Sequence, residues 1–506
     1  MRIASIFAMT AVLGVLAGGI TPARAHDDPD KLPPMTAKQF ADRVGTIICV
    51  LADHYYYEID SGDLLRWAVN GLYGRRQSKV PDEIAVRLEK ASNSGRKELN
   101  DILAAVADNC GGDLRWCADI AAERLLSHLD GRTELIDRKF ILYETRSLWV
   151  GIGVRLEVDP KSGLPRVVYP HRDGSAYKAG LRSGDVITEI TRQTGNVNKL
   201  QITVSATKDM SLAQFDATLR GKAGTEVRLK VQRAGVADLL EFKLARAESD
   251  EETVLGTRRN KDDRWIHWLD AAHTIAYVRL TQFREQTRKD AANVVVGLHN
   301  QGMKALILDL RNSKGGYLLT ADSIAGLFVG DAPLYTIRFR NEAISYFKKA
   351  NGKGDSDFSV VCLANMETAN SAVVLAAGLQ DNKRAIIAGE RTSGDASIIH
   401  LYQLDSTCVL RVPGAVYFRP SGKKLDRIHP PGKPSDEWGV TPDKGFELAL
   451  TAKERDQLRA HFENQLIIPP PGQAKEQAPA FKDRQLEMAV EYLRSRIQPG
   501  QGSPSS

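Results

Sequence analysis

Residues 305–329, ALILDLRNSKGGYLLTADSIAGLFV, join a strand-like apolar run, a turn that ends in Gly315-Gly316 and an apolar helix-like segment. Strands that alternate with helices indicate a parallel sheet with both faces covered. The sequence therefore predicts the α/β class for residues 271–445. The other segments of this alternation are TIAYVRL (274–280), a helix from about Thr287 to Gln301, SVVCLAN (359–365), NSAVVLAAGLQD (370–381) and AIIAGE (385–390).

Composition changes divide the rest of the chain, which at 506 residues is too long for one core. Residues 26–146 carry apolar residues at three- and four-residue spacing, which predicts a helical N-terminal region. Residues 147–248 hold short strand-like runs and predict a β-domain, which a polar connector (249–270) joins to the α/β core. C-terminal helices with a Pro-rich linker (446–494) and a disordered tail (495–506) are expected to follow.

Charge and motif content exclude several classes of function. The chain has 69 Lys and Arg against 63 Asp and Glu, a net charge of +6. Both signs alternate along the sequence, whereas a nucleic-acid-binding protein gathers basic residues into a stripe, so we predict no nucleic-acid partner. HExxH and the CxxC zinc spacing are both absent from the sequence, so we expect neither a metal nor another cofactor.

The N-terminus predicts export. Arg2 precedes an apolar run from Ile3 to Ile20, and Ala23-Arg24-Ala25 supplies a small-x-small cleavage pattern. These features predict a signal peptide over residues 1–25 and a mature chain in the periplasm or another extracytoplasmic space. The alternative is an uncleaved anchor helix, which would then be the membrane contact of the chain.

Five cysteines are present, and because five is odd at least one is unpaired or bonds another chain. Cys110 and Cys117 flank a Gly-Gly turn, so in an oxidising compartment a local disulfide between them is plausible. Cys362 and Cys408 lie in strand-like runs, where cysteine usually acts as a small buried apolar residue.

A glycine-rich loop begins the β-domain. Val150-Gly151-Ile152-Gly153 precedes a strand, a geometry in which free backbone N–H groups can receive a carboxylate. Together with GSAYKAGLRSGDVI (174–187), the region resembles a permuted PDZ domain of bacterial processing peptidases. The resemblance implies that a peptide C-terminus binds as an added strand, with a groove helix from about Ser211 to Arg220. Alternatively, the domain is a spacer whose groove holds nothing or a segment of its own chain.

The rest of the chain resembles C-terminal processing (tail-specific) serine peptidases over about residues 40–495. The resemblance implies a crotonase-like α/β core with a Ser nucleophile, a Lys general base and often a supporting Gln. It also implies that the turn at Gly315 and Gly316 supplies the oxyanion side of the site, with Lys314 in the usual Pro place. The motifs that carry it are AYVRLTQF (276–283), KALILDLRNSKGG (304–316), LQDNKRAIIAGERTSG (379–394) and WGVTPD (438–443).

The residues at the catalytic positions depart from the family pattern. Aligned without a gap, the family's nucleophile position holds Asn370, the base position Asp395 and the Gln position Ile399. An amide has no nucleophilic hydroxyl, and a carboxylate offers no neutral amine. Whether the chain is an enzyme stays open on the sequence alone.

Three functions follow from these observations. The leading prediction is a protein that binds polypeptide C-termini, or a partner peptidase, without cutting. The second is an active serine endopeptidase for extracytoplasmic proteins in which Ser371 serves as the fallback nucleophile. The third is a structural homo-oligomer built through the helical N- and C-terminal segments.

Overall fold

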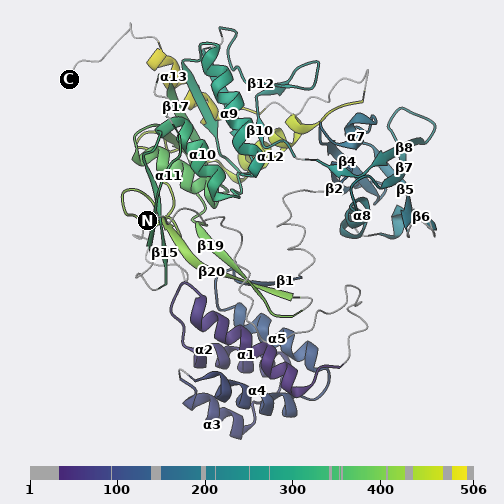
Figure 1. The fold of residues 1–506 in the computed structure, drawn as a ribbon, viewed down its shortest axis with the longest axis vertical. Helices are drawn as coiled ribbons and strands as arrows, with labels where there is room; N and C mark the ends of the chain where they lie inside the picture. Colours follow the sequence, from purple (N-terminus) through teal and green to yellow (C-terminus); the bar gives the residue numbers. More distant parts are fainter. Residues whose placement is uncertain are drawn as a thin grey trace, which may run out of the picture. The chain divides into compact units, whose positions relative to one another are not determined.

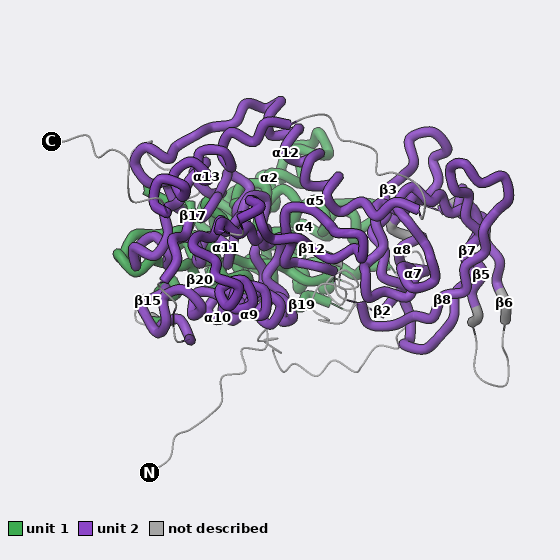
Figure 2. The backbone as a smooth tube through the Cα atoms, turned by 90° about the horizontal axis from the view of Figure 1, so that it is seen from above, with its two compact units in different colours: residues 1–145, 335–348, 394–439 green, residues 146–334, 349–393, 440–506 purple. Residues whose placement is uncertain are grey.

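The computed structural model describes residues 34–92, 94–137, 150–194, 201–210, 212–249, 251–272, 274–340, 345–352, 354, 357–405, 408–427, 437–470 and 481–497. The predicted signal peptide and most of the predicted tail lie outside these ranges. None of the helices within them is long and apolar enough to cross a membrane. The chain divides into two compact units, shown in Figure 2. Unit 1 comprises residues 1–145, 335–348 and 394–439, and unit 2 comprises residues 146–334, 349–393 and 440–506.

The N-terminal part of unit 1 is helical, as its apolar spacing predicts (Figure 1). Thr36 begins the first helix with a capping box, since its side chain accepts the Gln39 N–H while the Gln39 side chain accepts the Thr36 N–H. The apolar faces pack into one core, in which Phe40, Leu64 and Ile102 are fully buried. The helices are α1 (Ala37–His54), α2 (Ser61–Arg75), α3 (Asp82–Lys90), α4 (Arg96–Cys110) and α5 (Leu114–Leu126).

Unit 1 also contains an antiparallel sheet that the alternation of strands and helices did not predict. Strand β20 (Cys408–Phe418) lies at its centre and pairs with β1, β15 and β19. Leu410 and Val412 of β20 belong to the same core as the N-terminal helices, which explains why these distant segments form one unit. The other strands are β1 (Glu134–Asp137), β15 (Pro333–Phe339), β16 (Ser345–Lys349) and β19 (Ser397–Gln403).

Unit 2 contains the predicted parallel sheet, which confirms the α/β class. Its strand order is β10-β13-β14-β17-β18, and β13, β14, β17 and β18 run parallel. Ala489 and Leu493 of α13 pack against Ile307 on one face of this sheet. The strands are β10 (Val254–Leu255), β13 (Ile275–Leu280), β14 (Ala305–Asp309), β17 (Ser359–Ala364) and β18 (Ile386–Gly389). The helices are α9 (Glu285–Asn300), α10 (Leu318–Val329), α11 (Ser371–Asp381), α12 (Ala452–Leu466) and α13 (Arg484–Ile497).

The β-domain of unit 2 is a six-stranded sheet with helix α8 (Leu212–Leu219) against it. Buried and exposed residues alternate along β7, as expected for a strand with one face on a core. That core includes Ile190, Phe215 and Leu229. The strands are β3 (Val154–Val158), β4 (Pro165–Pro170), β5 (Val186–Thr194), β6 (Gln201–Ala206), β7 (Glu226–Gln232) and β8 (Leu240–Ala245). Beside them lie the paired β2 (Val150–Gly151) and β9 (Ala247–Glu248), the short helix α7 (Ser175–Lys178) and, in the connector, β11 (Arg258–Arg259) and β12 (Trp265–Ile266).

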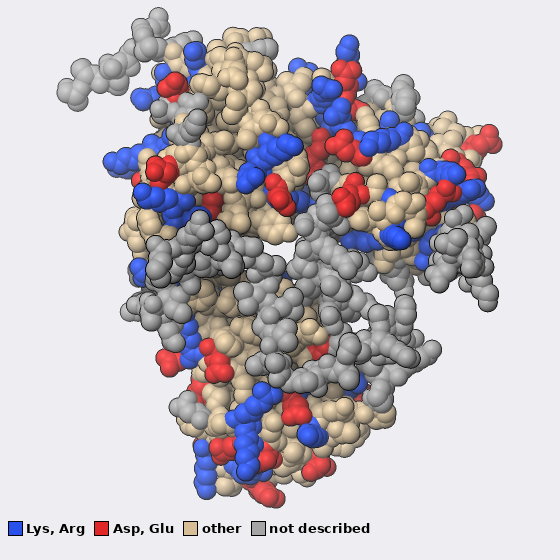
Figure 3. Space-filling view, viewed as in Figure 1, with Lys and Arg blue, Asp and Glu red and all other residues tan. Residues whose placement is uncertain are grey.

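Charge is mixed on the visible surface. On the face drawn in Figure 3, basic and acidic side chains are interspersed rather than gathered into separate areas. This distribution agrees with the alternation of both signs along the sequence.

Candidate functional site

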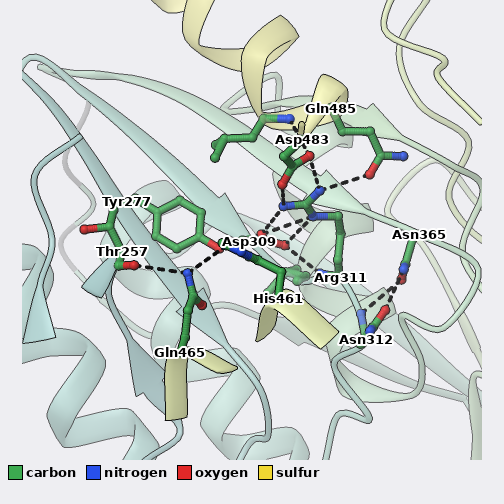
Figure 4. Close-up of polar contacts among 12 residues, drawn as sticks. Thr257, Tyr277, Asp309, Arg311, Asn312, Asn365, His461, Gln465, Asp483 and Gln485 are labelled. Atoms are coloured by element: carbon green, nitrogen blue, oxygen red, sulfur yellow. Dashed lines mark hydrogen bonds and ion pairs between the residues drawn. The ribbon is translucent and has the colours of Figure 1, made fainter. Parts of the chain in front are cut away.

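Two turns meet at the carboxyl ends of neighbouring parallel strands, where ligands bind in open α/β sheets. One turn follows β14 and contains Asn312 and Ser313, and the other follows β17 and begins at Asn365. The backbone N–H of Asn312 donates to Asn365 Oδ1 (3.0 Å), and Asn365 Nδ2 donates to Asn312 Oδ1 (2.6 Å) (Figure 4). The Ala369 N–H donates to the Ser313 carbonyl oxygen (2.9 Å). These bonds hold the predicted oxyanion turn against the predicted nucleophile segment.

Asn370 has a strained backbone at the start of α11. Its φ of 54° and ψ of −128° are unusual for a residue with a side chain, and such conformations cost about 1–3 kcal/mol. A sharp strand–turn–helix connection of this kind presents a nucleophile in α/β-hydrolases. Here the same kind of turn presents an amide, which cannot be activated as a nucleophile.

Gly315 packs directly on this turn. A Cβ atom at Gly315 would lie 2.7 Å from the Ala369 carbonyl oxygen and from the Ser371 nitrogen, and 2.8 Å from Asn370 Cβ. Its φ of +70° also favours glycine. The glycine therefore permits the close approach of the two turns.

The fallback nucleophile Ser371 is shielded. It is the first residue of α11, its side chain is fully buried, and its Oγ has no hydrogen-bond partner among the described residues. A nucleophile needs both a base within hydrogen-bond reach and access to the substrate. The burial of Ser371 argues against that role.

Asp395, which the sequence predicts at the base position, takes part in an ion cluster of unit 1. Its Oδ1 accepts from Arg132 Nη1 at 3.3 Å. Arg132 also donates to Asp130 (3.1 Å) and to the fully buried carboxylate of Asp426. Burial opposes the charge of Arg132, but the bonds and charges of these carboxylates outweigh it and raise its pKa above the usual value. Asp395 is thus the partner of an arginine and does not replace a neutral amine base.

Ile399, at the family's Gln position, lies in β19 next to a register shift between Ile398 and Ile399. Its apolar side chain offers no hydrogen bond to a nucleophile or a base. Positions 395 and 399 belong to unit 1, whereas position 370 belongs to unit 2.

Arg311, the first residue of the oxyanion turn, is fully buried in a second ion cluster (Figure 4). Its Nε and Nη2 donate to Asp309 at 3.0 and 2.7 Å, and its Nη1 and Nη2 both donate to Asp483 at 2.8 Å. Gln485 Oε1 accepts from Nη1 (3.1 Å), and Tyr277 OH donates to Asp309 Oδ2 (2.7 Å). Hydrogen bonds and an ion pair therefore connect the start of helix α13 to the turn.

Burial and charge act in opposite directions within this cluster. Burial would lower the pKa of Arg311, but the two carboxylates outweigh burial and hold that pKa well above its usual value. Burial would likewise raise the pKa of Asp483, and the Arg311 charge outweighs it, so this pKa is lowered. Both groups are therefore charged at neutral pH.

An exposed ion pair connects the two turns at the protein surface. Lys314 Nζ lies 3.4 Å from Glu367 Oε2, and Arg459 Nη2 lies 3.1 Å from Glu367 Oε1. The exposed side chain of Met366 precedes Glu367. Large and charged side chains thus occupy a segment in which the family pattern has small residues.

The loop predicted to bind a carboxylate lines a small, partly open pocket of about 30 Å³ in the β-domain. The Gly221 N–H donates to the Val150 carbonyl oxygen (3.3 Å), so the end of α8 lies against this loop. The adjacent strand β3 forms one edge of the six-stranded sheet and contacts α8. A strand edge beside a helix is the groove used for strand addition. The lining residues are Val150, Gly151, Ile152, Gly153, Val154, His171, Asp216, Leu219, Arg220 and Ser249.

Position 153 requires a glycine because of its backbone conformation and its close neighbours. Its φ is +72°, and a Cβ atom there would lie 2.7 Å from Ser249 Oγ and 2.9 Å from Gly174 Cα. The second glycine of the loop therefore allows the chain at Gly174 to approach closely.

The cysteines Cys110 and Cys117 lie side by side. Their Sγ atoms are 2.6 Å apart, both thiols are buried and free, and Arg76 Nη1 donates to Cys110 Sγ (3.0 Å). Burial raises the pKa of Cys110 to about 11. The disulfide between them stays a prediction. Cys362 and Cys408 are buried in strands, and the described residues contain no cluster of metal-ligating side chains.

The sequence analysis missed the partners of the predicted residues. Arg132 and Asp395 are 263 positions apart, and no sequence pattern connects them. By contrast, Asp216 and Arg220 have the i,i+4 spacing of an ion pair on a helix, a signal that was available in the predicted groove helix.

Comparisons with known proteins identify a peptidase family. Residues 274–444 match the model of peptidase family S41. The chain is 29% identical over 301 residues to a carboxyl-terminal-processing protease of Synechocystis sp., covering 59% of this chain and 63% of that protein. It is 27% identical over 361 residues to a carboxy-terminal-processing protease of Bartonella bacilliformis, covering 68% and 74%.

Two further comparisons concern a chloroplast protein and a solved structure. The chain is 30% identical over 297 residues to the chloroplastic C-terminal processing peptidase of Tetradesmus obliquus, covering 58% and 59%. It therefore spans less than two thirds of the Synechocystis and Tetradesmus proteins. The solved structure of a photosystem II D1 C-terminal processing protease is 24% identical to this chain. The match covers 82% of this chain and 94% of that protein, with a TM-score of 0.38.

Proposed function

Because the chain belongs to the family of C-terminal processing serine peptidases, we propose that it is an exported homologue that binds polypeptide C-termini without cleaving them. The observation that carries the proposal is Asn370, which occupies a strained strand–helix turn beside the glycine turn but presents an amide. The partners are protein C-termini or a partner peptidase.

The absence of cleavage follows from the chemistry of the three altered positions. Acylation needs a hydroxyl or thiol nucleophile and a group that removes its proton. Asn370 supplies no hydroxyl, Asp395 is held by Arg132, and Ile399 makes no hydrogen bond through its side chain. The turn at Gly315 and Gly316 could still hold an oxyanion, but none forms without a nucleophile.

Binding is supported by the groove of the β-domain, which we interpret as a permuted PDZ domain. An added strand would pair with the edge strand β3, while the loop from Val150 to Gly153 would receive the terminal carboxylate. Ile152 and Leu219 give the pocket an apolar part, so apolar C-terminal residues are the expected ligands.

Export is supported by the signal segment at residues 1–25, which lies outside the described residues. A mature chain in an extracytoplasmic space would meet the C-termini of other exported proteins there.

The test of non-cleavage uses the purified mature chain with unfolded β-casein. We expect no cleavage and no adduct with a fluorophosphonate probe, and Ser371→Ala is expected to change neither result. Cleavage that disappears in Ser371→Ala would contradict the proposal and establish the active endopeptidase instead.

The test of binding uses pairs of peptides that differ only in a free or amidated C-terminus. A charge-assisted hydrogen bond to backbone donors contributes about 1.5–3 kcal/mol, so the free acid is expected to bind roughly tenfold or more tightly. Equal affinity of the two forms in calorimetry would contradict the proposed ligand class.

A further inference from the structure

The groove helix α8 ends in an ion pair that lies beside the predicted carboxylate loop. Asp216 and Arg220 both line the pocket formed by residues 150–153, and they face each other one helical turn apart. Neither residue belongs to the glycine loop. We propose that Arg220 binds the terminal carboxylate of the ligand and that Asp216 forms an ion pair with Arg220 when no ligand is bound. This inference rests on the proposed function, since it assumes that C-termini enter the groove.

The positive charge of Arg220 opposes the repulsion between the C-terminal end of α8 and a bound carboxylate. The C-terminal end of a helix carries partial negative charge, which repels a carboxylate. The end of α8 lies close to the loop, because a Cβ atom at Gly151 would be 3.7 Å from the Leu219 carbonyl oxygen. A cation next to Leu219 therefore favours the binding of a carboxylate there, and Arg220 lines the pocket at that position.

A second arginine neutralises the helix end from the other side. Arg246 Nε donates to the Leu219 carbonyl oxygen (3.0 Å), and its Nη2 donates to the Thr218 carbonyl oxygen (2.8 Å). Arg246 is buried and does not line the pocket. Because Arg246 satisfies these carbonyl groups, the guanidinium of Arg220 can be directed toward a ligand.

The present pairing of Arg220 is easily exchanged. Its Nε lies 2.9 Å from Asp216 Oδ2, and its Nη2 contacts the same oxygen, so the two groups do not form the stronger fork with two parallel bonds. The side chains of Arg220 and Asp216 remain 20% and 37% exposed, and exposed i,i+4 pairs contribute little to stability. A peptide carboxylate can offer both oxygens to the guanidinium and replace Asp216.

If the ligand carboxylate replaces Asp216 on Arg220, substitutions of Arg220 and of Asp216 should change the affinity for a free-acid peptide in opposite directions. Arg220→Gln is expected to weaken a free-acid peptide with an apolar C-terminal residue by about tenfold, and to reduce the preference for acid over amide. Asp216→Asn removes the competing carboxylate and its repulsion, so the same free-acid peptide is expected to bind about two- to fivefold more tightly. The amidated peptide is expected to bind both variants as it binds the wild type.

The experiment is calorimetry of the full mature chain with the free-acid and the amidated peptide. The matched control is Arg228→Gln, which breaks an exposed pair with Glu226 on β7 outside the pocket and is expected to leave both affinities unchanged. Arg220→Lys is the second variant, because it keeps the charge but loses the fork. It is expected to retain part of the preference for the acid, and thermal unfolding verifies that each variant is folded.

Each outcome separates the inference from the function on which it rests. If the wild type binds acid and amide equally, the proposed function fails. If the wild type prefers the acid and folded Arg220→Gln keeps the full preference, the loop alone binds the carboxylate and only the inference fails. If Asp216→Asn weakens the free acid as much as Arg220→Gln, the pair supports the helix and the exchange is refuted.

Discussion

Arg311 in unit 2 and Arg132 in unit 1 are each paired with carboxylates, and each cluster contains or adjoins a residue that the sequence predicts to be part of the site. Arg311 begins the glycine turn and is fully buried between Asp309 and Asp483. Arg132 is paired with two buried carboxylates, and its third partner, Asp395, is 43% exposed. The first cluster is closed to solvent, whereas the second ends at the surface.

The two clusters differ in how much stability a substitution is expected to cost. A buried guanidinium that loses a carboxylate is left with an uncompensated charge, which makes every member of the Arg311 cluster costly to replace. Position 395 lies at the exposed end of its cluster, where Arg132 keeps Asp130 and Asp426 whatever residue 395 is. A neutral substitution at position 395 is therefore expected to cost little stability.

The largest effect is expected for Asp483→Asn. This variant keeps an oxygen for the Leu486 N–H at the start of α13 but removes one charge from Arg311. Breaking a buried ion pair costs about 3–5 kcal/mol, and because Asp309 remains we expect about 3 kcal/mol in urea unfolding. The control Asp456→Asn breaks the exposed pair with Arg459 and is expected to cost less than about 1 kcal/mol. Equal effects of the two variants would abolish the contrast between closed and exposed clusters.

Low pH is expected to remove the stabilising contribution of Asp483 gradually. The pKa of Asp483 is lower in the folded than in the unfolded chain, so its contribution to stability is complete above the unfolded pKa of about 3.9. The contribution is lost as the pH falls from there through the folded pKa. The gap in unfolding free energy between wild type and Asp483→Asn should therefore be constant near neutral pH and shrink below about pH 4. A gap that stays constant down to pH 2 would show that Asp483 does not act through its charge.

A smaller loss is expected for Asp395→Lys, which places a lysine at the predicted base position. The new ammonium would stand beside Arg132, and like charges disfavour one another and lower the pKa of the new lysine. We expect a loss of about 1–2 kcal/mol in urea unfolding at low salt. Higher ionic strength should reduce the loss, because the position is exposed. A stable Asp395→Lys at low salt would mean that Arg132 does not constrain this position.

The smallest effect is expected for Asp395→Asn. Arg132 retains two carboxylates, and exposed ion pairs contribute about 0–1 kcal/mol, so the variant should unfold within about 1 kcal/mol of the wild type. Comparison with Asp395→Lys separates lost attraction from added repulsion at one position. A loss as large as that of Asp483→Asn would show that the two clusters are equally constrained.

Sequence reasoning found the parallel sheet because its strands are short runs of buried apolar residues between helix-like segments. Strands β13, β14, β17 and β18 all lie within the runs used for that prediction. It did not find the antiparallel sheet of unit 1. Although β19 and β20 are close in sequence, β20 also pairs with β1 and β15 from far along the chain, with Glu134 opposite Arg411 and Thr336 opposite Phe418. Pairing over such a separation leaves no local pattern.

For the candidate site, the sequence predicted the positions of residues but not their conformations or partners. Motif spacing indicated residues 370 and 395, but it contained nothing about the strained backbone of Asn370 or the burial of Ser371, which depend on packing between distant turns. The partners Arg132 and Asp483 lie 263 and 172 positions from the residues that they bind. Local periodicity describes neighbours along a helix or strand, so such partners require the folded structure.

The hydrogen bonds of Arg311 also place a condition on the order of synthesis. Asp483 and Gln485 follow Arg311 by 172 and 174 residues, so the turn cannot complete its contacts until the chain has been made through residue 485. A chain interrupted before residue 483 would have a sheet with one face uncovered and a guanidinium without its second carboxylate. Since domains fold as units and exposed apolar surface favours aggregation, incomplete chains would be recognisable to chaperones and to quality-control proteases. Helix α13 and the residue before it are therefore needed both to cover the sheet and to complete the ion cluster of Arg311.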